Sequence, residues 1–126
     1  MRIPEIFEAK KKENKPVLSF EIFPPKKDAA LKSIDETLYL MCDLKPDFIS
    51  VTFGAGGSTV DNKTVEIAKK IKKEYHIEPL VHLTCLHYGK AELEEILIQL
   101  EDAGIENVLA LRGDINPDIP RKYDFK

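Results

Sequence analysis

Apolar residues along this 126-residue chain follow two different spacings. Some occur in short runs rich in β-branched and aromatic residues, which are typical of buried strands. Others recur at intervals of three and four residues, which is typical of helices with one buried face. The pattern predicts strands at 17–23, 48–53, 79–85 and 107–112, and helices at 3–14, 28–44, 60–75 and 90–103.

The order of these elements is a strand followed by a helix, repeated three times, and then a final strand. This order predicts a parallel sheet with right-handed helical crossovers. The strands are almost continuously apolar, as expected when both faces of the sheet are covered. Two architectures fit the pattern: an open doubly wound sheet, or part of an eight-stranded α/β barrel.

Composition excludes several classes of protein. Hydrophobic residues make up 43% of the chain and charged residues 33%, which is typical of a globular protein. A net charge of −3 without a basic stripe argues against nucleic-acid binding. No apolar run approaches the roughly 20 residues of a membrane helix, and the first 14 residues lack the apolar core of a signal peptide. The two cysteines imply no disulfide framework, so a reducing cytoplasm is expected.

Polar residues occur at the C-terminal end of each predicted strand. In barrels and in open sheets alike, ligands bind at this edge. Proximity to solvent would explain any single polar residue, but four strands with polar ends indicate a binding site. The residues are Glu21 on the first strand, Thr52 on the second, His82 and Thr84 on the third, and Arg112 and Asp114 after the fourth.

Glu21 lies in an otherwise apolar run, residues 19–25. A carboxyl group desolvated among Phe and Ile side chains is expected to hold its proton more tightly than in water. Such a group is suited to general acid catalysis near neutral pH. On residue type alone, a structural ion pair with a buried Lys or Arg is an equally good interpretation. Asp114 also has two equally good interpretations: it binds a ligand N–H, or it caps a turn.

Two further motifs are weak. The glycine-rich stretch 54–58 has the position of a phosphate-binding loop but completes neither GxGxxG nor a P-loop, so a tight turn is the better interpretation. His82, Cys85 and His87 suggest zinc by their spacing, but strand alternation directs Cys85 and His87 away from His82 if the strand continues that far. We therefore predict no metal site and interpret Cys85 as a small buried side chain.

Four segments taken together resemble the bacterial methylenetetrahydrofolate reductase family. They are SFEIFPPK (19–26), DFISVTFGAGGST (47–59), HLTC (82–85) and ALRGD (110–114), in the order and at the spacing of that family. The resemblance implies an eight-stranded (β/α)8 TIM barrel that carries FAD and reduces 5,10-methylenetetrahydrofolate to 5-methyltetrahydrofolate, with NADH or NADPH as electron donor. It also implies a cytoplasmic enzyme of one-carbon metabolism and methionine biosynthesis, often a homo-oligomer.

The resemblance assigns roles to individual residues. Glu21 matches the catalytic acid, which would protonate N10 of the folate so that its five-membered ring opens to an iminium that accepts hydride. Asp114 matches a carboxylate close to the flavin ring and the folate pterin, so both carboxylates are expected to contact substrate. Phe53 replaces a Tyr found in many relatives, and no phenol hydrogen bond is expected there. The expected flavin contacts are Thr52, Phe53, Ala55, His82, Arg112, Gly113 and Asp114.

The chain supplies fewer strands than a complete barrel, which needs roughly 250 residues. We therefore expect residues 1–126 to form a single partial domain, the N-terminal half of the barrel, that needs its C-terminal half. Alone it is expected to bind FAD poorly and to have no reductase turnover. The alternatives are another flavin barrel, such as a proline dehydrogenase-like enzyme, and a non-catalytic half-barrel assembly subunit. An aldolase is disfavoured because no predicted strand ends in a Schiff-base lysine.

Overall fold

The computed structural model describes residues 1–25, 31–53, 62–115 and 117–118. Each helix and strand lies where the sequence predicts it, and most end one or two residues sooner. The predicted helix starts at 28 and 60 lie outside the described residues. The elements are α1 (Ile3–Lys12), β1 (Ser19–Ile22), α2 (Leu31–Asp43), β2 (Phe48–Val51), α3 (Asn62–Lys73), β3 (Glu78–Thr84), α4 (Lys90–Asp102) and β4 (Asn107–Leu111).

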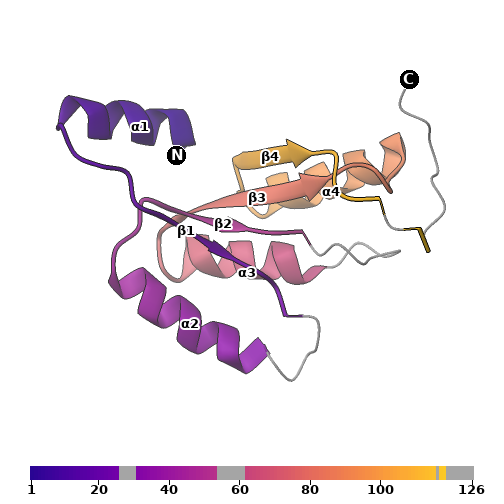
Figure 1. Ribbon diagram of the computed structural model, residues 1–126, viewed down its shortest axis with the longest axis horizontal. Coiled ribbons are helices and arrows are strands. Elements are labelled where there is room, and N and C mark those ends of the chain that lie inside the picture. The colour runs from indigo at the N-terminus through magenta and orange to yellow at the C-terminus, as the bar shows by residue number, and fades with distance from the viewer. Residues whose placement is uncertain (26–30, 54–61, 116, 119–126) are drawn as a thin grey trace.

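The strands form one parallel sheet in the order β1-β2-β3-β4, so each strand pairs with its successor in sequence (Figure 1). Ser19 is paired with Phe48 and Leu80 with Asn107. An open doubly wound sheet reverses its strand order at a switch point, whereas strands of a barrel follow one another around it. The observed order therefore confirms the parallel α/β fold and is consistent with part of a barrel.

The hydrophobic core lies between one face of the sheet and the three crossover helices. Alternate strand residues point to this face, and apolar residues at helical spacing meet them from α2, α3 and α4. Complete burial of each Leu or Ile contributes about 1.5–3 kcal/mol to folding. The most buried members are Leu38, Ile49, Val51, Ala68, Ile71, Val81, Ile96 and Leu100.

The opposite face of the sheet carries the intervening strand residues. Leu109 and Leu111 of β4 are 41% and 39% exposed there. The prediction that both faces are covered is therefore wrong for the part of the chain that the structure describes. The strands have nearly continuous apolar sequences because apolar residues lie on both faces of the sheet. On β1–β3 the residues that face the helices pack in the core, whereas every residue of β4 after Asn107 is exposed.

Helix α1 lies apart from the crossover helices, at the end of the sheet where the strands begin (Figure 1). The buried side chain of Asn107 joins it to β4, because its Oδ1 accepts from the amide of Ile3 and its Nδ2 donates to the carbonyl of Met1, both at 2.9 Å. The Met1 ammonium also contacts Glu78 at 2.8 Å and Glu106 at 2.6 Å. These contacts close the end of the sheet that lies opposite the predicted site. None of the helices in the described residues is long and apolar enough to cross a membrane.

Candidate functional site

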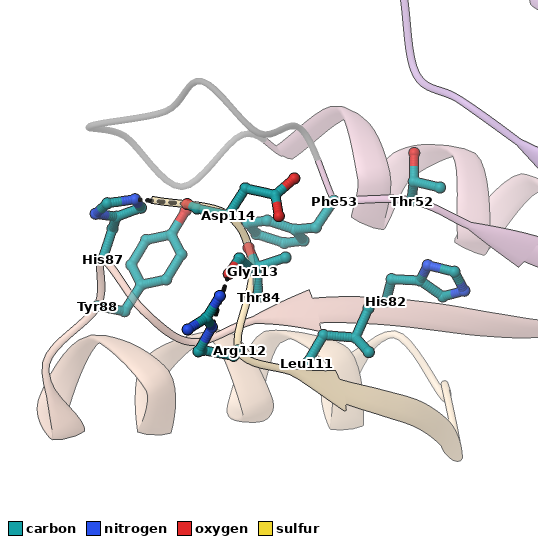
Figure 2. A pocket seen from close by; sticks show the side chains of 10 residues that line it. All are labelled: Thr52, Phe53, His82, Thr84, His87, Tyr88, Leu111, Arg112, Gly113 and Asp114. Atoms are coloured by element: carbon teal, nitrogen blue, oxygen red, sulfur yellow. Dashed lines mark hydrogen bonds between the residues drawn. The ribbon is translucent and has the colours of Figure 1, made fainter. Parts of the chain in front are cut away.

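A pocket of about 380 Å³ opens where β2, β3 and β4 end (Figure 2). This is the edge at which the sequence predicted a site. Every described member of the expected flavin-contact set lines it, while Ala55 lies outside the described residues. Contact with flavin itself stays a prediction. The lining residues are Thr52, Phe53, His82, Thr84, His87, Tyr88, Leu111, Arg112, Gly113 and Asp114.

The end of β2 supplies one apolar wall of this pocket. Phe53 is buried in the core, and its ring meets that of Tyr88 edge-on, with centroids 5.9 Å apart. Such pairs contribute about 0.5–1.5 kcal/mol beyond the area they bury. The edge contact fixes the turn after β3 against the end of β2. Phe53 therefore offers the pocket an aromatic surface without a hydroxyl group.

Glu21 and His82 meet across the face of the sheet that is not covered by the helices. Glu21 Oε1 lies 3.6 Å from His82 Nε2, and the two side chains are 48% and 13% exposed. Ser50 of β2 pairs with Glu21 on one side and with Leu80 on the other. Because Ser50 is short, the longer side chains of β1 and β3 can approach each other over it. The two residues form an ion pair when the imidazole is protonated.

The expected burial of Glu21 is not found in the described part of the chain. Strand alternation turns Phe20 and Ile22 to the helix-covered face and Glu21 to the other. The carboxyl group is therefore half exposed, and the prediction that its apolar sequence neighbours desolvate it is wrong. The structural alternative, an ion pair with Lys or Arg, is not found among the described residues, where the ionisable group beside Glu21 is the His82 imidazole, which is charged only when protonated.

The segment that follows β4 is held against the end of β3. Backbone amides of Cys85 and Leu86 donate to the carbonyls of Leu111 and Arg112, both at 2.9 Å. Gly113 has φ of +85°, and a Cβ atom there would lie 2.9 Å from Cβ of Thr84. Only glycine fits this approach without a shift of the main chain. The close packing places Asp114 directly at the pocket.

The pocket carries charge of both signs at its open side. Arg112 and Asp114 are exposed, and Figure 2 shows their side chains extending in different directions from the segment after β4. Arg112 Nε donates to the carbonyl of Gly113 at 3.3 Å, which leaves the other guanidinium nitrogens available to a ligand. Together with the rings of Phe53 and Tyr88, these groups suit a planar ligand whose edge is polar and whose face is apolar.

The prediction that His87 points away from His82 required the strand to continue to residue 87, and both histidines line the pocket. β3 ends at Thr84, so the alternation on which the prediction depended stops before residue 87. No group of three metal-ligating side chains occurs among the described residues. Cys85 is partly buried, and burial raises the pKa of its thiol, which disfavours the thiolate that zinc requires. Sequence reasoning missed Tyr88, in the turn after β3, and Leu111, the last residue of β4, although the C-terminal ends of parallel strands and the loops after them commonly contribute to sites.

Comparison with known proteins identifies the family. The model of the methylenetetrahydrofolate reductase family matches residues 6–125. The probable methylenetetrahydrofolate reductase (NADH) of Oryza sativa subsp. japonica is 38% identical over 114 residues, which are 90% of this chain and 19% of that protein. The 5,10-methylenetetrahydrofolate reductase of Escherichia coli (strain K12) is 37% identical over 100 residues, 79% of this chain and 33% of its own.

A third relative, the 5,10-methylenetetrahydrofolate reductase of Buchnera aphidicola subsp. Baizongia pistaciae, is 41% identical over 98 residues. These residues are 78% of this chain and 33% of that protein. The chain thus spans between about a fifth and a third of the length of the curated relatives it matches. The resemblance inferred from four segments is confirmed, and the chain belongs to the methylenetetrahydrofolate reductase family.

Proposed function

We propose that this chain is part of a reductase that converts 5,10-methylenetetrahydrofolate to 5-methyltetrahydrofolate, with FAD as cofactor and NADH or NADPH as electron donor. Residues 1–126 would form a single partial domain, the N-terminal half of a (β/α)8 barrel in a cytoplasmic enzyme. One observation supports this most strongly: the family-matched residues of three strands line one pocket at the C-terminal edge of a parallel sheet. Three plant relatives are named as NADH enzymes.

The described residues of the pocket fit the ring of a flavin. Hydrogen-bond donors for the oxygens and nitrogens of the ring come from Thr52, His82 and Arg112. Apolar surface for the face of the ring comes from Phe53 and Leu111. Gly113 presents no side chain, so a ligand can approach the main chain closely. When bound, the flavin would supply the hydride for the reduction.

We assign the two carboxylates to the folate. Glu21 is half exposed and lies on the sheet face that leads to the pocket, so its carboxyl group is accessible to substrate. It would donate a proton to N10 of the folate and thereby open the five-membered ring. His82 lies beside it, with Nε2 3.6 Å from Oε1, and would pair with the carboxylate when the imidazole is protonated. Asp114 would accept hydrogen bonds from N–H groups of the pterin.

The test uses the complete gene product and its Glu21→Gln variant. The wild-type protein is expected to show visible flavin absorbance and to oxidise NADH or NADPH when methylenetetrahydrofolate is supplied. Glu21→Gln is expected to lower folate reduction by about a hundredfold or more, because general acids contribute about 10²–10⁴-fold. It should leave reduction of the flavin by the nicotinamide nearly unchanged. Glu13→Gln, at an exposed glutamate of the α1 C-terminus, is the matched control.

The outcomes separate the alternatives. A protein without flavin, even after FAD is added, would favour a cofactor-free barrel or an assembly subunit. Normal folate reduction by Glu21→Gln would refute the acid role but not the activity. We also propose that residues 1–126 alone bind FAD poorly, because Leu109 and Leu111 are exposed on a face that the rest of a barrel would cover. Stoichiometric flavin in purified 1–126 would contradict this.

A further inference from the structure

We propose that His87 is a positioning residue that holds the main chain of Asp114 and thereby fixes its carboxylate at the pocket. His87 belongs to none of the four segments on which the family resemblance was based, and it follows β3 in the turn that leads to α4. The catalytic consequence of this inference depends on the proposed function, because the ligand of Asp114 is taken to be the folate.

The geometry of the imidazole assigns its hydrogen. His87 Nε2 lies 3.2 Å from the carbonyl oxygen of Asp114 (Figure 2). A carbonyl oxygen only accepts hydrogen bonds, so Nε2 must carry the hydrogen atom. The other ring nitrogen, Nδ1, is buried and has no hydrogen-bond partner in the described part of the chain. A buried nitrogen acceptor without a partner is less unfavourable than a buried N–H donor without one, so the tautomer with its hydrogen on Nε2 fits the site.

Asp114 depends on this contact because it lies beyond the other anchors of its segment. The hydrogen bonds from Cys85 and Leu86 reach the carbonyls of Leu111 and Arg112, and Gly113 packs against Thr84. Within the part of the chain that the structure describes, the main chain of Asp114 is hydrogen-bonded by His87 and by no backbone group. Without it, the main chain after Gly113 would be free to rotate and to carry the carboxylate away.

The turn that carries His87 is itself rigid enough to act as an anchor. Its neighbour Tyr88 is buried and contacts Phe53 edge-on, and the amide of Tyr88 donates to the carbonyl of Cys85 at 3.3 Å. The position of Asp114 is therefore fixed through His87 to the ends of both β2 and β3. A displacement of about 1 Å at a reacting group can lower a rate by about a hundredfold, so a single positioning contact is enough to matter.

The experiment compares His87→Gln with His87→Leu in the complete gene product. The Gln amide can place an N–H close to the position of the imidazole Nε2, whereas Leu has similar size and no donor. We expect His87→Leu to lower kcat/KM for methylenetetrahydrofolate about tenfold and His87→Gln to stay within about twofold of wild type. His76→Asn, at an exposed histidine between α3 and β3, is the control and should change nothing.

A double-mutant cycle shows whether His87 acts through Asp114. In an Asp114→Asn background, His87→Leu should lower kcat/KM by about twofold or less, because the carboxylate that it positions is already absent. A general loss of structure would instead persist in that background. An equal tenfold loss with and without the Asp114 carboxylate would overturn the proposal. Equal activities of the Leu and Gln variants would overturn it as well.

One measurement does not depend on the activity. Nitrogen-15 NMR should show the His87 hydrogen on Nε2, and His87→Leu should lower the backbone order parameters of residues 113–115. If the wild-type protein fails to reduce the folate but both results hold, the proposed function fails and the positioning role stands. A hydrogen on Nδ1, or unchanged order parameters, would refute the positioning role whatever the activity.

Discussion

Replacement of Gly113 by alanine should destabilise the protein more than the same replacement at Gly104. Both glycines have positive φ, +85° and +75°. A Cβ atom at 113 would lie 2.9 Å from Cβ and 3.3 Å from Cγ2 of Thr84, whereas one at 104 would meet nothing within 4 Å. Gly104→Ala therefore measures only the free-energy cost of placing alanine in the left-handed conformation. Gly113→Ala adds the cost of the clash between the new Cβ atom and Thr84.

The two costs have different sizes. The left-handed conformation costs a non-glycine residue about 1–2 kcal/mol. Forcing an extra carbon atom into a packed contact costs about 1–3 kcal/mol more. We therefore expect a loss of about 1–2 kcal/mol in the free energy of unfolding for Gly104→Ala and of about 2–5 kcal/mol for Gly113→Ala. The larger loss is a substantial part of a typical total of about 5–15 kcal/mol.

Urea unfolding followed by circular dichroism measures both variants in the complete gene product. A second pair, Thr84→Gly with and without Gly113→Ala, removes the crowding atoms and should recover the steric part of the loss. Equal losses at the two glycines would refute the reasoning. They would show that the segment after β4 does not lie against Thr84 as described.

Two further predictions concern the opposite end of the sheet. Asn107→Ala should lower the free energy of unfolding by about 1–3 kcal/mol, because the amide of Ile3 and the carbonyl of Met1 lose their hydrogen-bond partner. An unchanged midpoint of thermal unfolding would contradict this. Hydrogen bonds from the Met1 ammonium and from Lys72 hold the pKa of Glu106 below its ordinary value. A lowered carboxylate pKa contributes stability that is present near neutral pH and is lost as the pH falls through the lowered value. The stability difference between wild type and Glu106→Gln should therefore be constant near pH 7 and shrink below about pH 4, and a difference that grows on acidification would contradict the assignment.

The position of the site could be predicted because it follows from topology. Thr52, His82 and Arg112 are far apart in sequence, but each stands at the C-terminal end of a strand or just after it. Parallel strands joined by helical crossovers all end at the same edge, so these residues must converge. Hydrophobic spacing alone was enough to locate the strands, and the strands were enough to locate the pocket.

What the sequence failed to predict depends on which way single side chains point. Glu21 was judged by the residues beside it in the chain, but Phe20 and Ile22 turn to the other face of the sheet. Strict alternation would have corrected this from sequence alone. His87 is different, because its direction depends on β3 ending at Thr84 and on contacts with residues 111–114. Such long-range contacts leave no local pattern in the sequence.

The contact of α1 with Asn107 has a consequence for the order of folding during synthesis. Each strand lies beside the strand made just before it, so a chain leaving the ribosome can add every new strand to an edge that already exists. Helix α1 can contact the start of β2 early, through Phe7 with Phe48 and Lys10 with Asp47, but the hydrogen bonds of its N-terminal end must wait for Asn107 of β4, which lies 104 residues after Ile3. The N-terminal end of α1 is therefore one of the last described parts that can be fixed in place. Its protection from a protease during translation would mark the moment at which β4 joins the sheet.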